Sequence, residues 1–535
     1  SGKEKEDNLP MKTQSKHLMT RRALLRLGTA GVAVGLARAA ATAQPAQAPA
    51  ATKLAGPRKG GTLTLALTAG IRQFHPMNTV PGHMNFIRAL YNALLHYGEQ
   101  LTPEPELAER WDFSADGLSM TLKLRQGVKF HSGREFTSDD VKATVDFAKT
   151  DELSTQGPQY KTIKTVETPD KYTAVLRFDT VNPGIFDLLD TLFIIDKETI
   201  ADRAKRGVGT GPFKMGNFLP NDRLELLAFK DYWEQGKPYL EKYIIRQIPD
   251  QASLSLNLEA GAVDYVSRLN YYDVVRLKET GKFTIDMGAP GRAIMDIALN
   301  CKRPPFDNKR VRQAIAWSVD RERFCKTALQ GLAKPTCLIW PSISWAHFPD
   351  LEGKIGFDLD KAKALLKEAG WGDGFETEIL TSSKRAYGYG ELAQILQSDL
   401  KKIGITAKIA DVEPALYDTR SNKRECSILI HAYGKGNRDP GSTLTGAKAW
   451  YTDKDGGLSR FESAAYDALI NEVNATLDQE KRKAACRKIQ ELALEECFTL
   501  PVAPVDEGMA YAKYVRGVRH NLHNIPYMAD VWLDK

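Results

Sequence analysis

The fold is decided by a stretch from Arg88 to Lys149, "RALYNALLHYGEQLTPEPELAERWDFSADGLSMTLKLRQGVKFHSGREFTSDDVKATVDFAK". Within it, "SMTLKLRQGVKF" alternates apolar and polar side chains on both sides of Gln126 and Gly127, which predicts two short strands around a turn. The next segment, "TSDDVKATVDFAK", places Thr137 three residues before Asp140, the spacing of a helix-capping box. Apolar residues then recur at helical spacing, so this stretch predicts strands followed by a helix.

The rest of the chain extends this pattern of strands and helices. "GGTLTLAL" (60–67) alternates as a strand does, while "DLDKAKALLKEAGW" and "ELAQILQSDLKKIGI" are amphipathic helices that each end at a glycine. Strands and helices alternate between residues 376 and 432, which predicts an α/β lobe with its ligand site at the strand ends. Because the chain is longer than one hydrophobic core supports, we expect two or three domains.

The chain resembles a known family, the bacterial extracellular solute-binding proteins of family 5. These are the peptide, nickel and opine binding subunits of ABC importers. The likeness begins in the stretch from Arg88 to Lys149 and covers nearly all the chain after the signal segment, in the right order. It continues through "GTGPFKMGNF" (209–218), "KDYWEQGKPYLEKYIIRQIPD" (230–250), "RPPFDNKRVRQAIAWSVDRERF" (303–324) and "FDLDKAKALLKEAGW" (357–371).

The resemblance implies an α/β fold, a two-lobed periplasmic-binding-protein clamp of the cluster C type, with a two-strand hinge. A ligand that touches both lobes would stabilise the closed form, which the permease then reads. The crossings between lobes are expected near 300–306 and 497–504. The expected parts are an export signal with an N-terminal extension (1–43), a linker (44–59), lobe I (60–88 and 208–300), an extra subdomain of lobe I (89–207), lobe II (301–497) and a return to lobe I (498–535).

The start of the chain predicts export to the periplasm. Residues 20–43, "TRRALLRLGTAGVAVGLARAAATA", have a basic pair before an Ala/Gly-rich stretch, the pattern of an export signal. Arg21 and Arg22 resemble the twin-arginine type, and cleavage is expected after Ala43. Arg38 interrupts the apolar run, which argues against a membrane-spanning anchor. No cysteine lies at the cleavage site, so a lipid-anchored form is not expected, and the ten residues before Met11 are set aside.

Charge and cysteine content limit the possible partners. Without residues 1–43 the chain has 66 basic and 64 acidic residues, a net charge of +2, so nothing indicates a nucleic-acid partner. The six cysteines include no pair spaced as C-x-x-C, so the sequence predicts no metal site of that kind. Whether these cysteines form disulfides stays open.

Three loops are candidates for the ligand cleft. The first, Thr381 to Gly390 ("TSSKRAYGYG"), links a strand to a helix, where side chains and helix N-terminal amides can meet a ligand. Arg385 would bind a carboxylate there, and Tyr387 and Tyr389 would offer stacking faces. The alternative is that these three are solvated loop residues.

The second loop, "HAYGKGNRDPGS" (431–442), contains a Gly-Lys-Gly sequence but is not a phosphate loop. A phosphate loop reads G-x-x-x-x-G-K-[ST], and here Lys435 is followed by Gly436. The two glycines leave space for a ligand to approach the backbone, so this loop is read as a wall of the cleft.

The resemblance also assigns roles in and near this second loop. Peptide-binding relatives have a Trp-x-x-Asp pattern whose Asp holds the ammonium group of the ligand. In this chain Tyr433 takes the aromatic position and Gly436 the Asp position, so the ammonium anchor is missing. Asp439 or Asp418 could act instead, and Arg420 matches a carboxylate-binding Arg of some oligopeptide binders.

The third loop, Arg72 to His83, contributes Asn78 and His83 as candidate ligand-binding residues. Together with His75 and His431, His83 also suggests a nickel or metal-chelate site. His520 and His523 are expected to be polar structure at the surface or near the hinge. Trp340 and Trp450 lie in the less family-typical parts of lobe II, which makes them further cleft candidates.

The sequence thus predicts a periplasmic substrate-binding subunit of an ABC importer, a monomer that captures a peptide-like, opine-like or other carboxylate-bearing small molecule. It would deliver this ligand to a membrane permease, perform no chemistry and need no cofactor. Nickel or metal-chelate binding, a sensor-docking role and a secreted hydrolase are the alternatives. The motifs G-x-S-x-G and H-E-x-x-H, which would favour a hydrolase, are absent from the sequence.

Overall fold

The computed structural model describes residues 56–71, 73–78, 81–98, 101–154, 156–203, 205–288, 291–434 and 438–535. The expected export signal, most of the linker and Gly436 lie outside these residues. In the described part of the chain, no helix has the length and apolar character needed to cross a membrane.

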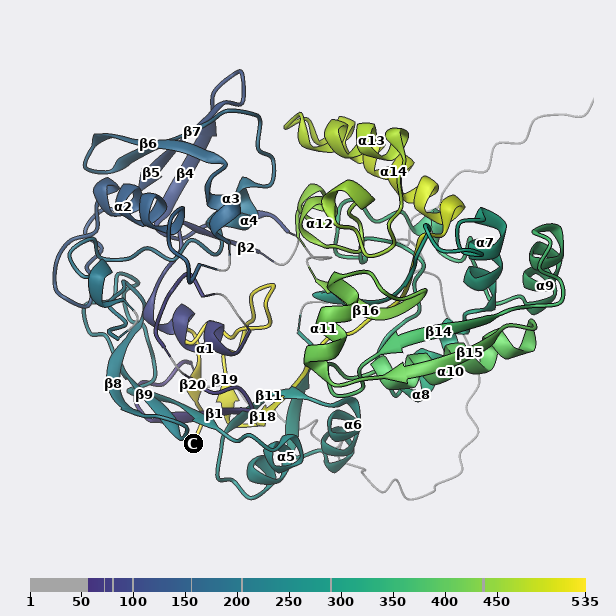
Figure 1. Ribbon diagram of the computed structural model, residues 1–535. Coiled ribbons are helices and arrows are strands. Elements are labelled where there is room, and N and C mark those ends of the chain that lie inside the picture. The colour runs from purple at the N-terminus through teal and green to yellow at the C-terminus, as the bar shows by residue number, and fades with distance from the viewer. Residues whose placement is uncertain are drawn as a thin grey trace, which may run out of the picture. The chain divides into compact units, whose positions relative to one another are not determined.

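Lobe I is built on a seven-stranded mixed sheet with β1 (Thr62–Leu67) inside it (Figure 1). β1 lies where the alternating sequence predicts a strand and pairs in parallel with β10 and β11. Leu63 and Leu65 are buried, so the alternation turns one face of the strand into the core. The strand order is β12 (Phe283–Asp286), β18 (Gly508–Ala512), β11 (Tyr265–Leu269), β1, β10 (Lys242–Gln247), β9 (Arg223–Ala228) and β8 (Phe213–Leu219).

Helices and a short ribbon complete this part of lobe I. Asp250 and Asn270 cap two helices by accepting hydrogen bonds from the amides of Ser253 and Asp273. The first helix packs against β11 and the second against β12 and β18, and together they bury a small apolar cluster. The elements are α1 (Pro81–Leu90), α5 (Gln251–Glu259), α6 (Tyr271–Thr280), β19 (Val515–Arg516) and β20 (Trp532–Leu533).

The extra subdomain is a four-stranded antiparallel sheet covered by α2 (Ser138–Ala148), with its own core. The capping box of Thr137 and Asp140 is confirmed at the start of α2. The prediction of a second strand after Gly127 is wrong, because Lys129 forms only an isolated bridge to Glu135. The sheet order is β4 (Ala108–Phe113), β5 (Ser119–Leu124), β7 (Thr173–Phe178) and β6 (Ile163–Asp170); beside it lie β2 (Leu95–Tyr97), β3 (Pro103–Pro105), α3 (Gly157–Tyr160), α4 (Ile185–Leu189) and the 3-10 turn Ile200–Asp202.

Lobe II is a five-stranded sheet with helices packed around it (Figure 1). The strand order is β15 (Thr406–Asp411), β14 (Glu376–Thr381), β16 (Ile428–Gly434), β13 (Ala293–Leu299) and β17 (Thr499–Pro504). The helices are α7 (Lys309–Ser318), α8 (Arg321–Thr327), α9 (Leu359–Glu368), α10 (Tyr389–Lys402), α11 (Pro414–Asn422), α12 (Pro440–Gly446), α13 (Ala464–Asn474) and α14 (Gln479–Glu496), with 3-10 turns at Pro349–Leu351 and Asp453–Asp455.

The six cysteines all lie in this half of the chain, and none forms a disulfide. Five are buried, and Cys301 is partly exposed. Because burial removes the thiols from solvent, these residues behave as small apolar groups of the lobe II core.

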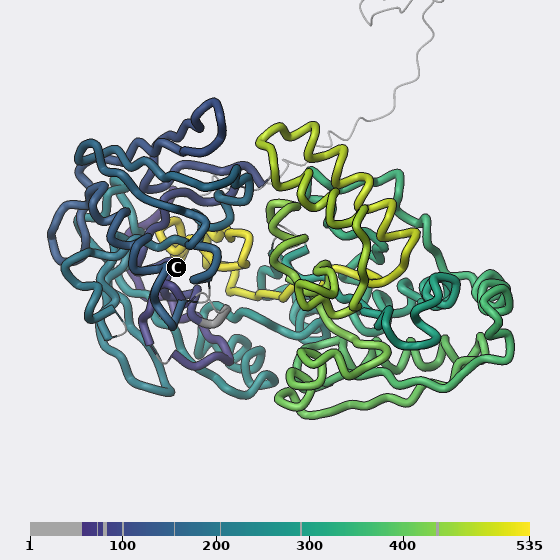
Figure 2. Tube along the Cα trace, turned by 45° about the horizontal axis from the view of Figure 1, so that its top comes forward, coloured from purple at the N-terminus to yellow at the C-terminus, as the bar shows by residue number. Residues whose placement is uncertain are grey.

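The crossings between the lobes differ from the predicted boundaries. β13 and β17, which were expected at the ends of lobe I, pair with each other and with β16 in the lobe II sheet. The described residues of the first crossing are 287, 288, 291 and 292, and the second crossing lies at 505–507, where Figure 2 lets the reader follow the chain from β17 to β18. Pairing between strands far apart in sequence decides this boundary, and no local pattern reveals it.

Candidate functional site

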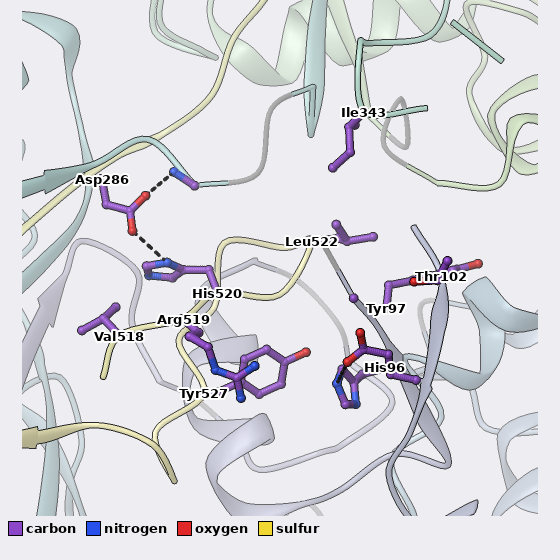
Figure 3. A pocket seen from close by; sticks show the side chains of 13 residues that line it. His96, Tyr97, Thr102, Asp286, Ile343, Val518, Arg519, His520, Leu522 and Tyr527 are labelled. Atoms are coloured by element: carbon purple, nitrogen blue, oxygen red, sulfur yellow. Dashed lines mark hydrogen bonds and ion pairs between the residues drawn. The ribbon is translucent and has the colours of Figure 1, made fainter. Parts of the chain in front are cut away.

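A cavity of about 670 Å³ lies where the C-terminal segment meets the hairpin of β2 and β3 (Figure 3). Most of its wall belongs to lobe I, and Ile343 is contributed by lobe II. The volume is within the usual range of small-molecule sites. The lining residues are His96, Tyr97, Gly98, Thr102, Glu104, Asp286, Gly288, Ile343, Val518, Arg519, His520, Leu522 and Tyr527.

Hydrogen bonds on both ring nitrogens fix His520 in this wall. Nδ1 lies 3.1 Å from Oδ2 of Asp286, and Nε2 lies 2.7 Å from the hydroxyl of Tyr265. The bond from His520, helped by the amide of Gly288 at 2.7 Å, lowers the pKa of Asp286 below its ordinary value despite partial burial. Asp286 and His520 therefore form a rigid edge of the cavity.

Arg519 and Tyr527 provide a cation beside an aromatic face. The Arg519 guanidinium lies 5.4 Å from the centre of the Tyr527 ring and donates to Asp530 through Nε and Nη2. The Tyr527 hydroxyl is buried and finds no hydrogen-bond partner among the described residues. His96 packs 5.4 Å from the Tyr527 ring. This side of the cavity can therefore offer an anion a charged donor beside an aromatic face.

A cluster of four side chains, three of them buried and one, His523, partly exposed, joins the two lobes beside this cavity. We call it the Arg438 cluster: Arg438 of lobe II with Arg88, Asp190 and His523 of lobe I. Arg438 Nη1 lies 3.0 Å from Asp190 Oδ2, and Arg88 Nη2 lies 2.6 Å from Asp190 Oδ1. Arg438 also bonds the His523 ring. Asp190 is 1% exposed and Arg438 6% exposed, so these opposite charges pair away from water.

The cluster sets the charge of its two titratable members. Burial alone would raise the pKa of Asp190, but Arg88, His523 and Arg438 hold that pKa well below its ordinary value. Burial, together with the charge of Arg438, lowers the pKa of His523 to about 4. At neutral pH Asp190 is therefore ionised and His523 uncharged.

A second contact between the lobes lies next to this cluster. The amide of Asp439 donates to Oδ1 of Asp187 at 3.3 Å, and the hydroxyl of Tyr97 donates to the same oxygen at 2.7 Å. Asp439 caps α12 at the amide of Gly441 and accepts from Arg482 at 2.5 Å. Since Tyr97 also lines the cavity, the cavity and the contact between the lobes share a residue.

Asp506 ties the two hinge crossings together. Its carboxylate accepts from the amide of Gly291 at 3.0 Å and from the amide of Arg292 at 3.2 Å, both on the other crossing. Burial raises the pKa of Asp506 to about 6, although these two amides oppose the shift. The folded protein therefore holds a proton here that the unfolded chain releases at lower pH.

We expect the variant Asp506→Asn to be more stable than the wild type at pH 8, by up to about 3 kcal/mol, and equal to it near pH 4. Between pH 3.8 and about 6 the folded state binds more protons than the unfolded state at Asp506, so this group's contribution to stability falls as pH rises through that window. Urea unfolding of both proteins from pH 4 to 8 measures the effect. A difference that does not change with pH would contradict it.

The first predicted loop does not line the cavity. Arg385 is exposed and pairs with Asp418 at 3.0 Å, so its charge is already balanced. Tyr387 donates to the carbonyl of Ala328 and lies 5.3 Å from the ring of Tyr271 in lobe I, beside the hinge. Tyr389 was expected in the loop but begins α10, where it is 6% exposed and bonds the amide of Ala432.

The second predicted loop supplies structure on its described side. Arg420 pairs with Glu378 on β14, and Asp439 pairs with Arg482 at the start of α12. Tyr433 is 3% exposed and donates to the carbonyl of Ile339. Asp439 is therefore committed to structure, and Gly436 lies outside the described residues.

The two tryptophans do not line the cavity. Trp340 and Trp450 are 0% exposed within the core of lobe II, and the ring of Trp450 packs edge-on against Tyr433 and Phe498. The expectation that they line the cleft is corrected here. Their position in an unusual stretch of sequence says nothing about which way an indole ring points.

The third loop also has structural contacts. His75 is fully buried and accepts from the amide of Met77 at 3.1 Å, while its other ring nitrogen lies 2.7 Å from Asp151. His83 packs 5.4 Å from the ring of Phe86, and the backbone amide of Asn78 donates to His75. Within the described ranges, no group of three or more His, Cys, Asp or Glu side chains could hold a metal ion.

The cavity residues come from segments other than the three predicted loops. His520 was expected to be polar structure near the surface or hinge, and it lines the cavity; His523 belongs to the Arg438 cluster. Arg519 and Tyr527 lie in the same C-terminal segment. A signal was present in that segment, "VRGVRHNLHNIPY", because three basic or imidazole side chains and a tyrosine fall within nine residues.

Comparison with known proteins gives relatives over most of the chain. Heme-binding protein A of Haemophilus influenzae is 28% identical over 77% of this chain and 81% of its own length. A dipeptide-binding protein of Escherichia coli is 27% identical over 82% of this chain and 88% of its own length.

A solved structure agrees with the two-lobed α/β fold. The periplasmic binding protein DppA of Helicobacter pylori, in complex with the peptide STSA, matches with a TM-score of 0.74 and 26% identity, over 89% of this chain and 99% of that chain. The model of the bacterial extracellular solute-binding proteins, family 5 Middle, matches residues 102–455. This match covers well over half of the chain, and the protein therefore belongs to the bacterial extracellular solute-binding proteins of family 5.

Proposed function

We propose that this protein is the periplasmic subunit of an ABC importer and that it holds a carboxylate-bearing organic solute in the cavity beside the Arg438 cluster. The cavity of about 670 Å³, with walls from lobe I and from Ile343 of lobe II, is the observation on which the proposal rests. A solute there touches both lobes, so its binding energy favours the closed form.

Arg519 is the reason to expect a ligand that carries a carboxylate. It donates to Asp530 through Nε and Nη2, and Nη1 has no hydrogen bond to another described residue, so a ligand anion has a donor available. The heme, dipeptide and peptide named for the relatives are all compounds with carboxylates. Gly436, at the position of the ammonium anchor in the family pattern, supplies no charge for a free amine.

Export and delivery are supported by the sequence and by the family. The twin-arginine-like segment at residues 20–43 is consistent with transfer to the periplasm. The permease partner follows from the family's transport role, because a protein that encloses a solute needs a membrane protein to receive it. The protein acts as a monomer in this proposal.

Native mass spectrometry of the purified protein, followed by calorimetric titration, tests the proposal. The titrants are dipeptides, N-acetylated dipeptides, opines and heme. We expect Arg519→Ala to lower the affinity for a carboxylate-bearing ligand tenfold or more, because a charge-assisted hydrogen bond is lost. Asp530 keeps Lys237 as a partner at 2.5 Å, so the substitution strands no charge.

Arg516→Ala is the matched control, since Arg516 is three residues away, has a side chain that is 40% exposed against 62% for Arg519, and does not line the cavity. Equal losses in both variants, or no loss in either, would place the ligand elsewhere. Titration with methyl esters of the same ligands separates charge from shape, because an ester keeps the shape and removes the anion.

A further inference from the structure

We propose that Asp187 and Asp190 form a cation-binding recess which the chain fills with its own Arg438, and that Arg438 thereby excludes solutes with a cationic group at this end of the cavity. The consequence of this inference, the choice of solute, rests on the proposed function. The recess itself can be tested without any solute.

The recess has more acceptor capacity than lobe I can satisfy. Arg88 occupies one side of Asp190, through the carbonyl oxygen at 2.8 Å and Oδ1 at 2.6 Å. The other carboxylate oxygen, Oδ2, faces Arg438 at 3.0 Å. In Asp187, Oδ1 accepts from Tyr97 and from the amide of Asp439, while Oδ2 is buried with no hydrogen-bond partner among the described residues.

Arg438 supplies the positive charge that this recess needs. His523 contacts the guanidinium, but its pKa of about 4 leaves it uncharged at neutral pH. With Arg438 in place, Asp190 faces the guanidinium groups of Arg88 and Arg438, while the Tyr97 hydroxyl and the amide of Asp439 bind Asp187. Without it, the carboxylates of Asp187 and Asp190 outnumber the one remaining guanidinium of the recess, that of Arg88, which also contacts Glu106 at 3.5 Å.

The recess lies at the end of the proposed ligand cavity. Tyr97 belongs to both, because its hydroxyl binds Asp187 and its ring lines the cavity. Leu522 of the cavity wall is the neighbour of His523 in the chain. The Arg438 guanidinium lies 6.0 Å from the centre of the Tyr97 ring. A solute that reaches past Tyr97 therefore meets a cation, which favours an anionic or neutral group and repels an amine.

The variant Arg438→Ala should turn the recess into a binding site for small cations. The probe is ethylguanidinium, which has the atoms that the substitution removes, and N-ethylurea is its uncharged counterpart. We expect millimolar ethylguanidinium to raise the melting temperature of the full-chain Arg438→Ala protein and N-ethylurea to leave it unchanged. The wild type should respond to neither, because its recess is filled.

Two further variants make the test specific. Arg487→Ala removes an exposed guanidinium that pairs with Asp350 on lobe II, and should show no response. Adding Asp187→Asn to Arg438→Ala should weaken the response at least tenfold, because the recess loses its excess charge. Equal responses in all variants, or no response in Arg438→Ala, would overturn the proposal.

The test can be made even if the Arg438→Ala protein is too unstable to be purified in the folded state. Its refolding yield in the presence of ethylguanidinium is then compared with its yield in the presence of N-ethylurea. If the solute proposal fails, the Arg519→Ala protein will bind the carboxylate-bearing ligand with unchanged affinity. That result does not depend on how the Arg438→Ala protein responds to ethylguanidinium. If both proposals hold, Arg438→Ala should bind an amine-terminated analogue of the solute at least tenfold more tightly than the wild type does.

Discussion

Asp190→Asn is expected to cost about 3–5 kcal/mol of unfolding free energy, because it leaves the buried guanidinium of Arg438 without a counter-charge and leaves Arg88 with only Glu106, 3.5 Å away. Asp190 is 1% exposed and pairs with both Arg88 and Arg438. An amide has the same shape but no charge, and neither arginine can lose its proton. Urea denaturation followed by circular dichroism measures the loss.

The matched control is Asp179→Asn, since Asp179 is 70% exposed and pairs with the exposed Lys164. Such a pair contributes at most about 1 kcal/mol. Adding Arg438→Met to Asp190→Asn should recover part of the loss, because the cation that the first substitution strands is gone. A loss of less than about 1 kcal/mol in Asp190→Asn would show that water reaches the cluster and replaces the carboxylate.

The same substitution changes the acid limb of the stability curve. Because folding lowers the pKa of Asp190, its contribution is present above the unfolded value of 3.8 and is lost as pH falls below it. The stability of the wild type should therefore decrease more steeply toward low pH than that of Asp190→Asn.

Phe498→Ala is expected to cost about 3–5 kcal/mol through the cavity it leaves in lobe II. The Phe498 ring is fully buried, stacks on Phe461 at 4.2 Å and packs edge-on against Tyr466 and Trp450. Urea unfolding, followed by tryptophan fluorescence, reports the loss close to Trp450. Ligand affinity measured well below the unfolding midpoint should stay within twofold of the wild type.

Leu416→Ala serves as the control, because Leu416 is an exposed apolar residue in the same lobe and its truncation leaves no cavity. We expect a change of less than about 0.5 kcal/mol there. If Phe498→Ala instead abolished ligand binding while the lobe stayed folded, the aromatic cluster around Trp450 would belong to the ligand site.

Much of the fold could be predicted from local sequence. Strand β1 follows the alternation of "TLTLAL", and α2 begins at the capping box of Thr137 and Asp140. The hinge boundary could not be predicted in this way, because β13 joins the lobe II sheet by pairing with residues at least 129 positions away in the chain. The alternation of a strand shows which face is buried and leaves the partner strand undetermined.

The site was harder to predict, because residue type reveals neither partner nor direction. Arg385 and Arg420 have the charge that a carboxylate needs, yet Asp418 and Glu378 already neutralise them. Trp340 has the aromatic surface of a ligand contact, yet the ring points into the core. Only the folded chain shows which polar groups remain available to a solute.

The pairing of β13 with β17 restricts how the lobes can move. Both hinge crossings continue directly from these neighbouring strands, which pair from Ala298 and Thr499 to Ile294 and Pro504, and Asp506 clips the crossings together just beyond. One crossing cannot slide along the other without breaking these hydrogen bonds, so shear between the lobes is costly. The lobes therefore have one easy relative motion, a rotation about the axis through the two crossings. A ligand that touches both lobes selects the angle of that rotation.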